Sequence, residues 1–344
     1  MNKPMTTTYS MWRMFRNCRK ACEYRYLRNL VPLEKDHNMA FGSVIHDCLE
    51  IWHGERELEK VIEHIDRTYA NRIKDDKQLA DWHLAIAMMT SYSERYATEG
   101  FDVQALEETF EGSIINPETN AASRSFVLAG KVDGLVIQDG QYFLLEHKTA
   151  AQVDAAYLER LWTDFQIILY AWYLEQTLGI KITGIIYNVL VKAKLRQSKG
   201  ETEAEFETRR AELIAKSKTG KSSAKRKMPE TDEAFQGRLR AKYGEPGMFH
   251  REELYISRDQ FTELRSELWE LSKAMLDARR RKTFYRNTAF CFQYGRACPY
   301  YPLCRSGENP NVIENCFEVV RPHEELRTEP KSDAPASDPQ NPVF

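Results

Sequence analysis

The sequence predicts an α/β fold, and three observations support this prediction. Two runs rich in β-branched, aromatic and aliphatic residues, 126–137 and 141–148, are separated only by Gln138-Asp139-Gly140. A third run of this kind covers 181–191. Between the second and third runs, 155–179 has the apolar periodicity of an amphipathic helix. Strands that alternate with helices in this way are typical of an α/β chain.

Other segments complete the expected order of elements. Helices are expected at 8–30, 42–53, within 56–98 and at 258–282, and strands at 103–115 and 249–257. Five regions follow: a helical N-terminal region at 1–100, a core at 101–191, a charged insertion at 192–248, a closing segment at 249–321 and a tail at 322–344. The tail is polar and rich in proline, so we expect it to be disordered.

The link between the first two strands predicts a tight hairpin. Asp-Gly between two such runs favours a type I′ turn, because both central residues of that turn need a positive φ. With Asp139-Gly140 as the two-residue loop, Gln138 pairs with Gln141. Each further step along the hairpin then pairs residues one position farther from the loop, which sets the register of the two strands.

This register brings two carboxylates together. Asp133 lies opposite Glu146, with Cβ atoms about 4.5–5.5 Å apart, and Lys148 is two residues along the same face. Two like charges at this separation repel, so the pair calls for a divalent cation between them. A lysine beside them can orient a water or balance negative charge on a substrate. The alternative is a surface hairpin with scattered charges.

The expected helix at 42–53 supplies a possible further ligand. Gly42, His46 and Glu50 recur every four residues and so share one helix face. A histidine there can join a metal held by carboxylates, and glycine one turn earlier allows another backbone or a nucleic-acid strand to approach closely. The alternative is a histidine that only packs in the core.

The expected helix at 155–179 carries a polar pair. Gln166 and Tyr170 are four residues apart and lie on one face. An amide and a phenol in this arrangement can hydrogen-bond a phosphate or a metal-bound water. The alternative is an ordinary half-buried polar pair.

Together these motifs resemble the RecB-like branch of the PD-(D/E)XK nuclease superfamily. That branch is marked by a G-x-x-x-H helix, an aspartate closing one strand, E-x-K on the next strand and a Q-x-x-x-Y helix. Here the motifs stand in that order as Gly42…His46, Gly130-Lys131-Val132-Asp133, Glu146-His147-Lys148 and Gln166…Tyr170. Val132 stands where the literal motif has proline, a position that is commonly replaced in the branch. The resemblance covers residues 8–190 and the cysteine segment near 291–304.

The resemblance implies a restriction-endonuclease-like core, in which a central mixed β-sheet is flanked by helices, and an enzyme that hydrolyses DNA. It implies that one or two Mg²⁺ or Mn²⁺ ions are held by His46, Asp133, Glu146 and the backbone carbonyl of His147. Lys148 is expected to position the attacking water, and Gln166 and Tyr170 the scissile strand. Exonucleolytic processing of DNA ends in recombination or repair is favoured over site-specific cutting.

The cysteines form a separate pattern. The chain contains seven: Cys18, Cys22, Cys48, Cys291, Cys298, Cys304 and Cys316. An odd number, and an N-terminus without an apolar leader, argue against a secreted disulfide framework. Three clustered thiolates and one distant thiolate can satisfy a four-thiolate centre of zinc or iron–sulfur. The distant ligand is expected to be Cys18 or Cys22, and Cys48 and Cys316 are expected to be buried free thiols.

The RecB-like branch includes members whose core is closed by a 4Fe–4S cluster, with one cysteine before the core and three after it. The chain resembles that layout, and Cys18-Arg19-Lys20 ahead of Tyr24 and Tyr26 looks like the branch's first-cysteine segment. The resemblance therefore favours Cys18 over Cys22, and it implies a cluster held by Cys18, Cys291, Cys298 and Cys304. Such a cluster would fasten the N-terminal helix to the C-terminal iron–sulfur segment.

Composition adds little by itself, because the formal net charge of −2 does not indicate a nucleic-acid binder. Two stretches are locally basic. Residues 192–227 form either a solvated loop or a phosphate-contacting flap. Residues 12–28 interleave arginines with aromatic residues, which suits either base stacking or simple helix packing.

The sequence has no glycine-rich phosphate loop and no transmembrane run, so any helicase or translocase is expected to be a separate protein. We expect a cytoplasmic protein of a bacterium or a phage-infected cell. DNA is its expected partner, and a recombinase, a single-strand annealing protein or a separate helicase are candidate protein partners. Two alternatives stay open: a DNA-binding scaffold subunit that does not cut, and a zinc-stapled regulatory module. The intact Asp133, Glu146 and Lys148 argue against the scaffold.

Overall fold

The computed structural model describes residues 3–34, 37–70, 72–293, 295–323 and 326. The chain divides into two compact units. Unit 1 contains Met1–Leu33, Arg124–Lys131 and Leu271–Phe344, and unit 2 contains Glu34–Ser123 and Val132–Glu270. Of the tail expected to be disordered, 324–325 and 327–344 lie outside the described residues.

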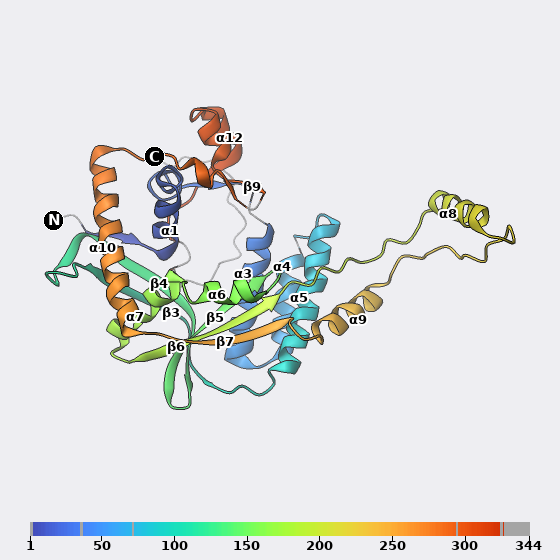
Figure 1. The fold of residues 1–344 in the computed structure, drawn as a ribbon, viewed down its shortest axis with the longest axis horizontal. Helices are drawn as coiled ribbons and strands as arrows, with labels where there is room; N and C mark the ends of the chain where they lie inside the picture. The colour runs from blue at the N-terminus through green and yellow to red at the C-terminus, as the bar shows by residue number, and fades with distance from the viewer. Residues whose placement is uncertain (1–2, 35–36, 71, 294, 324–325, 327–344) are drawn as a thin grey trace, which may run out of the picture. The chain divides into compact units, whose positions relative to one another are not determined.

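Unit 2 holds most of a mixed β-sheet (Figure 1). Its strands are β3 (Asp102–Ile115), the later part of β4 (Ala122–Gln138), β5 (Gln141–Ala150), β6 (Ile182–Val191) and β7 (Phe249–Tyr255). β4 and β5 are antiparallel, β5 and β6 are parallel, and β6 and β7 are antiparallel. A parallel pair needs a crossover, and α6 (Ala155–Leu161) and α7 (Phe165–Leu178) supply it. The expectation of an α/β fold with a mixed sheet is confirmed.

Three helices before the sheet contribute to an apolar core of unit 2. They are α3 (His37–Glu55), α4 (Leu58–Ala70) and α5 (Asp76–Arg95). Fully buried residues such as Ile45, Leu49 and Met88 pack there with the end of β6 and with α9 (Asp232–Tyr243). The remaining helices are α8 (Glu203–Lys216), inside the charged insertion, and α10 (Arg258–Arg281), which belongs to unit 2 up to Glu270 and to unit 1 from Leu271.

Two expected helices are interrupted. The helix expected at 155–179 breaks before Asp164, whose side chain caps α7 by accepting a hydrogen bond from Gln166 N at 3.0 Å. Aspartate favours such an N-cap over a helix interior. The helix expected at 8–30 becomes α1 (Tyr9–Asn17), α2 (Arg19–Cys22) and the π-helix η1 (Glu23–Leu27), because Cys18 is extended at φ −157°.

Unit 1 joins segments from both ends of the chain. β2 (Leu30–Pro32) pairs antiparallel with β10 (Phe317–Val319), and β1 (Met5–Thr7) pairs parallel with the first part of β4. Its other elements are η2 (Thr288–Phe290), β8 (Phe292–Gln293), β9 (Arg296–Ala297), α11 (Tyr301–Arg305) and α12 (Pro310–Cys316). A small core of Tyr24, Leu30, Tyr300, Leu303 and Phe317 holds the two ends together.

Among the described residues, none of the helices combines the length and the apolar character required to span a bilayer.

Candidate functional site

The hairpin between β4 and β5 has the turn and the register that the sequence predicts. Asp139 and Gly140 have φ values of 51° and 74°, as a type I′ turn requires. Gln138 pairs with Gln141, and the ladder continues in the expected register to the pair of Gly134 and Leu145. The prediction of this hairpin is confirmed over these pairs.

One residue beyond this ladder, the Asp133 side chain replaces the backbone as the acceptor. The amide of His147 donates to Asp133 Oδ2 at 2.7 Å. The other oxygen, Oδ1, lies 3.4 Å from Nδ1 of His46 on α3. Asp133 is therefore held from two sides, by the strand that carries the E-x-K motif and by the helix that carries the G-x-x-x-H motif.

Glu146 and Lys148 form a close ion pair on β5. They are two residues apart on one strand and so point to the same face of the sheet. The Glu146 side chain is nearly buried, whereas that of Lys148 is 29% exposed. A lysine in this position can reach a substrate without leaving the carboxylate.

The two carboxylates differ in their pKa. Burial raises the pKa of Glu146 to about 7, and the charge of Asp133 adds to the rise although Lys148 opposes it. Burial also disfavours ionisation of Asp133, but His46 and the His147 amide outweigh it and hold its pKa below the usual range. A bound divalent cation would favour the ionised form of both groups.

His46 has the surroundings of a site residue more than those of a core residue. A third of its side chain is exposed. Burial lowers its pKa, but the Asp133 carboxylate outweighs this and raises it overall. A Cβ on Gly42 would lie only 3.2 Å from Thr149 Oγ1, so glycine lets α3 approach β5 closely one turn before His46.

The imidazole of His147 points away from Glu146 and Lys148, because neighbouring residues of a strand face opposite sides. It is buried, stacks on His53 of α3 at 5.3 Å between ring centroids and meets the edge of His46 at 6.0 Å. Burial lowers its pKa to about 3, so the ring is neutral. Its Nδ1 lies 3.0 Å from Asn188 Nδ2.

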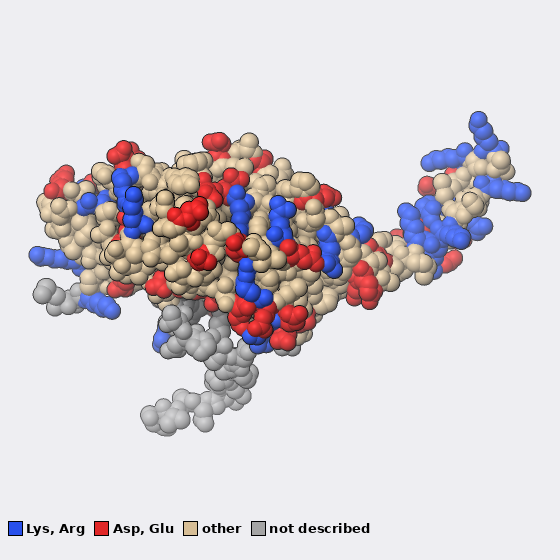
Figure 2. All heavy atoms as spheres, turned by 90° about the horizontal axis from the view of Figure 1, so that it is seen from below, with Lys and Arg blue, Asp and Glu red and all other residues tan. Residues whose placement is uncertain are grey.

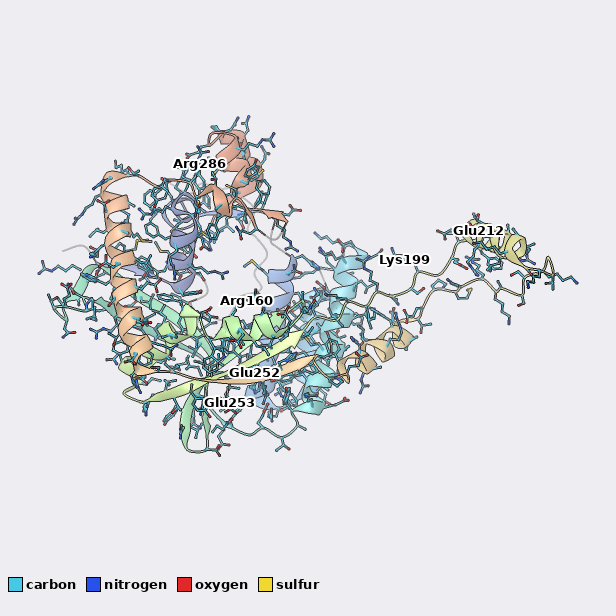
Figure 3. The ribbon with its side chains drawn as sticks, viewed as in Figure 1. Arg160, Lys199, Glu212, Glu252, Glu253 and Arg286 are labelled. Atoms are coloured by element: carbon cyan, nitrogen blue, oxygen red, sulfur yellow. The ribbon has the colours of Figure 1, made fainter. Side chains whose placement is uncertain are left out.

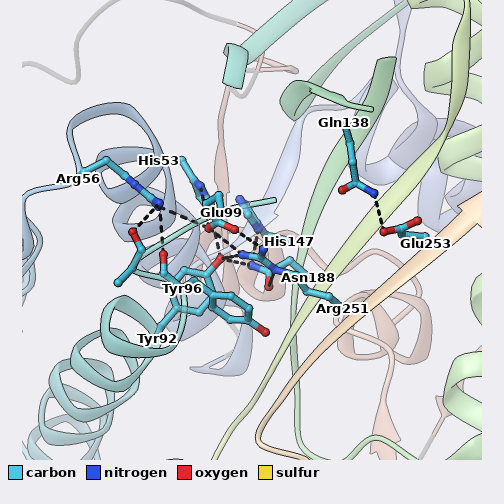
Figure 4. A network of polar contacts seen from close by, with 11 residues as sticks. His53, Arg56, Tyr92, Tyr96, Glu99, Gln138, His147, Asn188, Arg251 and Glu253 are labelled. Atoms are coloured by element: carbon cyan, nitrogen blue, oxygen red, sulfur yellow. Dashed lines mark hydrogen bonds and ion pairs between the residues drawn. The ribbon is translucent and has the colours of Figure 1, made fainter. Parts of the chain in front are cut away.

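Asn188 belongs to a buried polar network that sequence reasoning missed (Figure 4). Asn188 Nδ2 donates to the hydroxyl of Tyr92 at 2.9 Å, and that hydroxyl also lies 3.0 Å from His53 Nε2. Arg251 donates to the same hydroxyl and pairs through both terminal nitrogens with Glu99. The network supports the imidazole rings of His53 and His147, which lie behind the site. Its members come from segments that are far apart in the sequence, so no local pattern marks them.

The helix α7, which packs against β3 and β6, carries Gln166 and Tyr170 four residues apart on one face. Its cap residue Asp164 accepts a hydrogen bond from the hydroxyl of Tyr187 at 3.1 Å, and Tyr187 is the register partner of Glu146 on β6. Tyr170 is buried with its ring 5.2 Å from that of Phe110. The side-chain amide of Gln166 makes no hydrogen bond to another described residue, which leaves it available to a ligand.

The cysteines expected to form a four-thiolate centre all lie in unit 1. Cys18, Cys298 and Cys304 pack against the small core of this unit. Burial raises the pKa of Cys298, and the neighbouring thiols Cys18, Cys304 and Cys291 raise it further. The alternative ligand Cys22 is buried instead, and its thiol lies 3.7 Å from the carbonyl of Met11. Cys48 is buried as expected, whereas the expectation of a buried Cys316 is wrong, because this residue ends α12, a helix that buries none of its side chains.

Neither set of residues forms a finished metal site. Within the described part of the chain, no three His, Cys, Asp or Glu side chains are arranged to hold a metal ion. The donor types nevertheless suit the groups implied by the motifs. Two carboxylates and an imidazole suit a hard divalent cation, and four thiols are the number that an iron–sulfur cluster needs.

Comparison with known proteins agrees with the site geometry. The model of the PD-(D/E)XK nuclease superfamily matches residues 6–305, and the chain belongs to this superfamily. Members of the superfamily are typically metal-dependent nucleases. No curated protein matches the chain. A solved structure of a candidate exonuclease from Eubacterium rectale is similar over 87% of this chain and 86% of its own, with 10% identity and a TM-score of 0.43. A likeness this distant carries no argument about function.

Proposed function

We propose that the protein is a Mg²⁺- or Mn²⁺-dependent deoxyribonuclease of the RecB-like branch that degrades DNA from its ends in recombination or repair. One observation carries the proposal. Asp133 and Glu146 come from adjacent strands of one hairpin, Lys148 contacts Glu146, and His46 lies 3.4 Å from Asp133. This set combines metal-binding oxygens with a cation in a largely water-excluded place.

The roles of the residues follow from their positions. Asp133 and Glu146, with His46 and the carbonyl of His147, would hold the metal. When bound, the ion lowers the pKa of a coordinated water and offsets charge on the scissile phosphate. Lys148, still partly exposed, orients the water or neutralises that phosphate. Gln166 and Tyr170 on α7 position the strand to be cut.

The assay that tests this function is digestion of linear, nicked and circular DNA, with and without Mn²⁺. An exonuclease degrades the linear form, whereas an endonuclease also opens the closed circle. Lys148→Ala is compared with Lys181→Ala, and Glu146→Ala with Glu118→Ala, because Lys181 and Glu118 are exposed residues of unit 2 away from the motifs. DNA binding without cleavage by the wild type, under any metal, would favour the scaffold alternative.

We further propose that Cys18, Cys291, Cys298 and Cys304 hold a 4Fe–4S cluster in unit 1. The proposal is supported by the shared neighbourhood of these four thiols and by the resemblance in cysteine layout. Iron, zinc and sulfide analysis of anaerobically purified protein distinguishes this cluster from a zinc centre. Stoichiometric zinc without iron would contradict the 4Fe–4S cluster. It would still agree with a four-thiolate centre that joins the two ends of the chain.

A further inference from the structure

The charged insertion forms an arm that begins beside the candidate active site (Figure 1). Val191, the last residue of β6, is in register with Ala150 of β5, two residues after Lys148. Lys192 N then donates to the carbonyl of Ala150 at 2.7 Å. On the return side, α9 packs in the helical core, and Tyr243 accepts a hydrogen bond from Ala193 N at 3.3 Å. Both ends of the arm are thus anchored in unit 2.

The two sides of the arm are bonded to each other. Glu230 N donates to Ser198 O, and Glu201 N donates to Lys227 O, both at 2.9 Å. The Glu201 carboxylate accepts two hydrogen bonds from Arg209, at 2.5 and 2.8 Å, and one from Lys227 N at 3.0 Å. These bonds fold the insertion into a defined arm with α8 at its end, in contrast to the solvated loop that was the simpler expectation.

Most acidic side chains of the arm form ion pairs or capping hydrogen bonds with residues of the arm itself or of its base. Besides Glu201, the structure pairs Glu203 with Arg226 at 2.9 Å, Glu207 with Arg210 at 3.5 Å and Glu230 with Arg238 at 2.6 Å. Glu205 completes the capping box of α8 with Thr202. Only Glu212, labelled in Figure 3, lacks a cationic or capping partner among the described residues of α8.

The lysines at the end of the arm are in the opposite situation. Four of them lie within ten residues, are exposed and have no acidic partner within 4.0 Å among the described residues: Lys216, Lys218, Lys221 and Lys225. We name them the tip lysines. Figure 2 shows Lys and Arg side chains gathered on this arm. Like charges held this close repel one another, so the tip is suited to a partner that carries repeated negative charges.

We propose that the tip lysines bind backbone phosphates of the same DNA molecule that the active site cuts, at a distance from the cut. This inference rests on the proposed function for the identity of the polyanion. The arm starts at the end of the strand next to Lys148, so a DNA strand that leaves the site can follow it. The segment between Val191 and Glu203 spans at most about 40 Å when extended, or roughly twelve base pairs.

Exposed apolar side chains on the arm would suit a different partner, another protein. Leu213, Ile214 and Met228 are 40%, 36% and 70% exposed on the arm. A protein docked on these residues would depend on apolar area and only weakly on salt. Phosphate binding by lysines, in contrast, falls steeply with salt, because each neutralised phosphate releases condensed counterions. The salt dependence of binding therefore separates the two occupants.

The test measures binding of duplexes of about 8 and about 40 base pairs in metal-free buffer over a range of salt concentrations, so that no cleavage occurs. The tip variant is Lys216→Ala/Lys218→Ala/Lys221→Ala/Lys225→Ala. The matched control, Lys60→Ala/Lys74→Ala/Lys77→Ala/Lys181→Ala, removes the same charge from exposed positions elsewhere in unit 2. The tip variant should lower the salt slope on the long duplex by about 3.6, at roughly 0.9 for each of four lost phosphate contacts. It should leave binding and Mn²⁺-dependent cleavage of the short duplex unchanged.

Three outcomes would overturn the inference. The tip variant could keep the wild-type salt slope, the control variant could change the slope by the same amount as the tip variant, or the tip variant could lose the same affinity for short and long DNA. Failure of the proposed function has a different signature. In that case the wild type cuts neither duplex in Mn²⁺, while the tip variant still lowers the salt slope of binding to the long one.

Discussion

The two units of the molecule carry opposite charge. The parts of unit 1 at 1–33, 124–131 and 271–323 contain 18 lysines and arginines against 5 aspartates and glutamates. Unit 2 contains 29 lysines and arginines against 41 aspartates and glutamates. The net charge of −2 hides this difference, because it averages a basic unit with an acidic one. Charge informs about partners only when it is counted for each folded unit.

The comparison also assigns different chemistry to the two units. The carboxylates Asp133 and Glu146 lie in the acidic unit, where DNA phosphates meet repulsion unless cations offset it. Lys148 and the tip lysines are cations of this unit that can offset it, and the proposed divalent metal would add to them. The four thiols proposed to hold a cluster lie in the basic unit. We therefore expect DNA cleavage to respond to substitutions in the carboxylate site of unit 2, and iron content to respond to substitutions of the cysteines in unit 1.

The largest effect is expected from substitutions in the carboxylate site of unit 2. Glu146→Ala, Lys148→Ala and Asp133→Asn should each reduce cleavage of linear DNA at least about 10²-fold, because Glu146 and Asp133 would hold the metal and Lys148 would offset charge on the phosphate. Iron content and DNA binding should stay near wild type. Wild-type turnover by any of the three variants would contradict the assignment of that residue.

Cysteine substitutions should produce the reverse pattern in unit 1. Cys18→Ser, Cys291→Ser, Cys298→Ser or Cys304→Ser should each lose the cluster and lower the unfolding temperature, because a cluster couples its binding energy to folding. Cys48→Ser and Cys316→Ser are controls that should keep full iron content. Iron analysis of Cys18→Ser and Cys22→Ser decides between the two N-terminal cysteines. Retention of iron in the first and loss in the second would mean that Cys22 is the ligand.

Breaking the buried network should destabilise unit 2. Arg251→Met leaves the Glu99 carboxylate, whose side chain is 7% exposed, without its bidentate partner. The carboxylate keeps a longer contact with Arg56, at 3.4 Å, so the cost should exceed about 1 kcal/mol but stay below the about 3–5 kcal/mol of a fully unpaired buried charge. Arg240→Met, which breaks an exposed pair with Glu94, should cost at most about 1 kcal/mol. Chemical denaturation of both variants measures the difference, and equal costs would show that the network is not a source of stability.

His46 tests whether unit 2 uses a fourth metal ligand. His46→Ala should weaken Mn²⁺ affinity by about 10–100-fold and reduce activity in parallel, with partial rescue at high Mn²⁺. His250→Ala, on β7, is the control. If thermal stability falls while calorimetric Mn²⁺ affinity is unchanged, His46 is a packing residue.

The smallest effect concerns an ion pair in unit 1. Hydrogen bonds from Lys20, Tyr24 and Arg28 lower the pKa of Glu308 to about 2, with Lys20 the largest cause. Its stabilisation is therefore present above about pH 4.5 and is lost as the pH falls toward 2. Glu308→Gln should lower the free energy of unfolding at pH 7 by less than about 1 kcal/mol, which gives a slightly lower unfolding temperature. At pH 2 the substitution should have no effect. Glu314→Gln, which alters an exposed residue, should show no such pH dependence.

The parts of the site that lie close together in sequence could be predicted. The Asp139-Gly140 turn and the alternation of strand side chains indicate which residues of the hairpin face each other, and the ladder confirms this to Gly134 and Leu145. The helix spacing of Gly42 and His46 is equally local. Beyond Gly134 the hairpin register alone did not predict the contact that forms, because the Asp133 side chain accepts the hydrogen bond from the His147 amide.

The sequence by itself determined the elements, the hairpin register and the residue types of the site, because turn chemistry and periodicity act over a few residues. Only the tertiary structure decided that Tyr92, Asn188 and Arg251 meet behind the site, and that a near-neutral chain separates into a basic and an acidic unit. Contacts between residues tens of positions apart depend on how the elements pack. A one-dimensional pattern contains no signal of that packing.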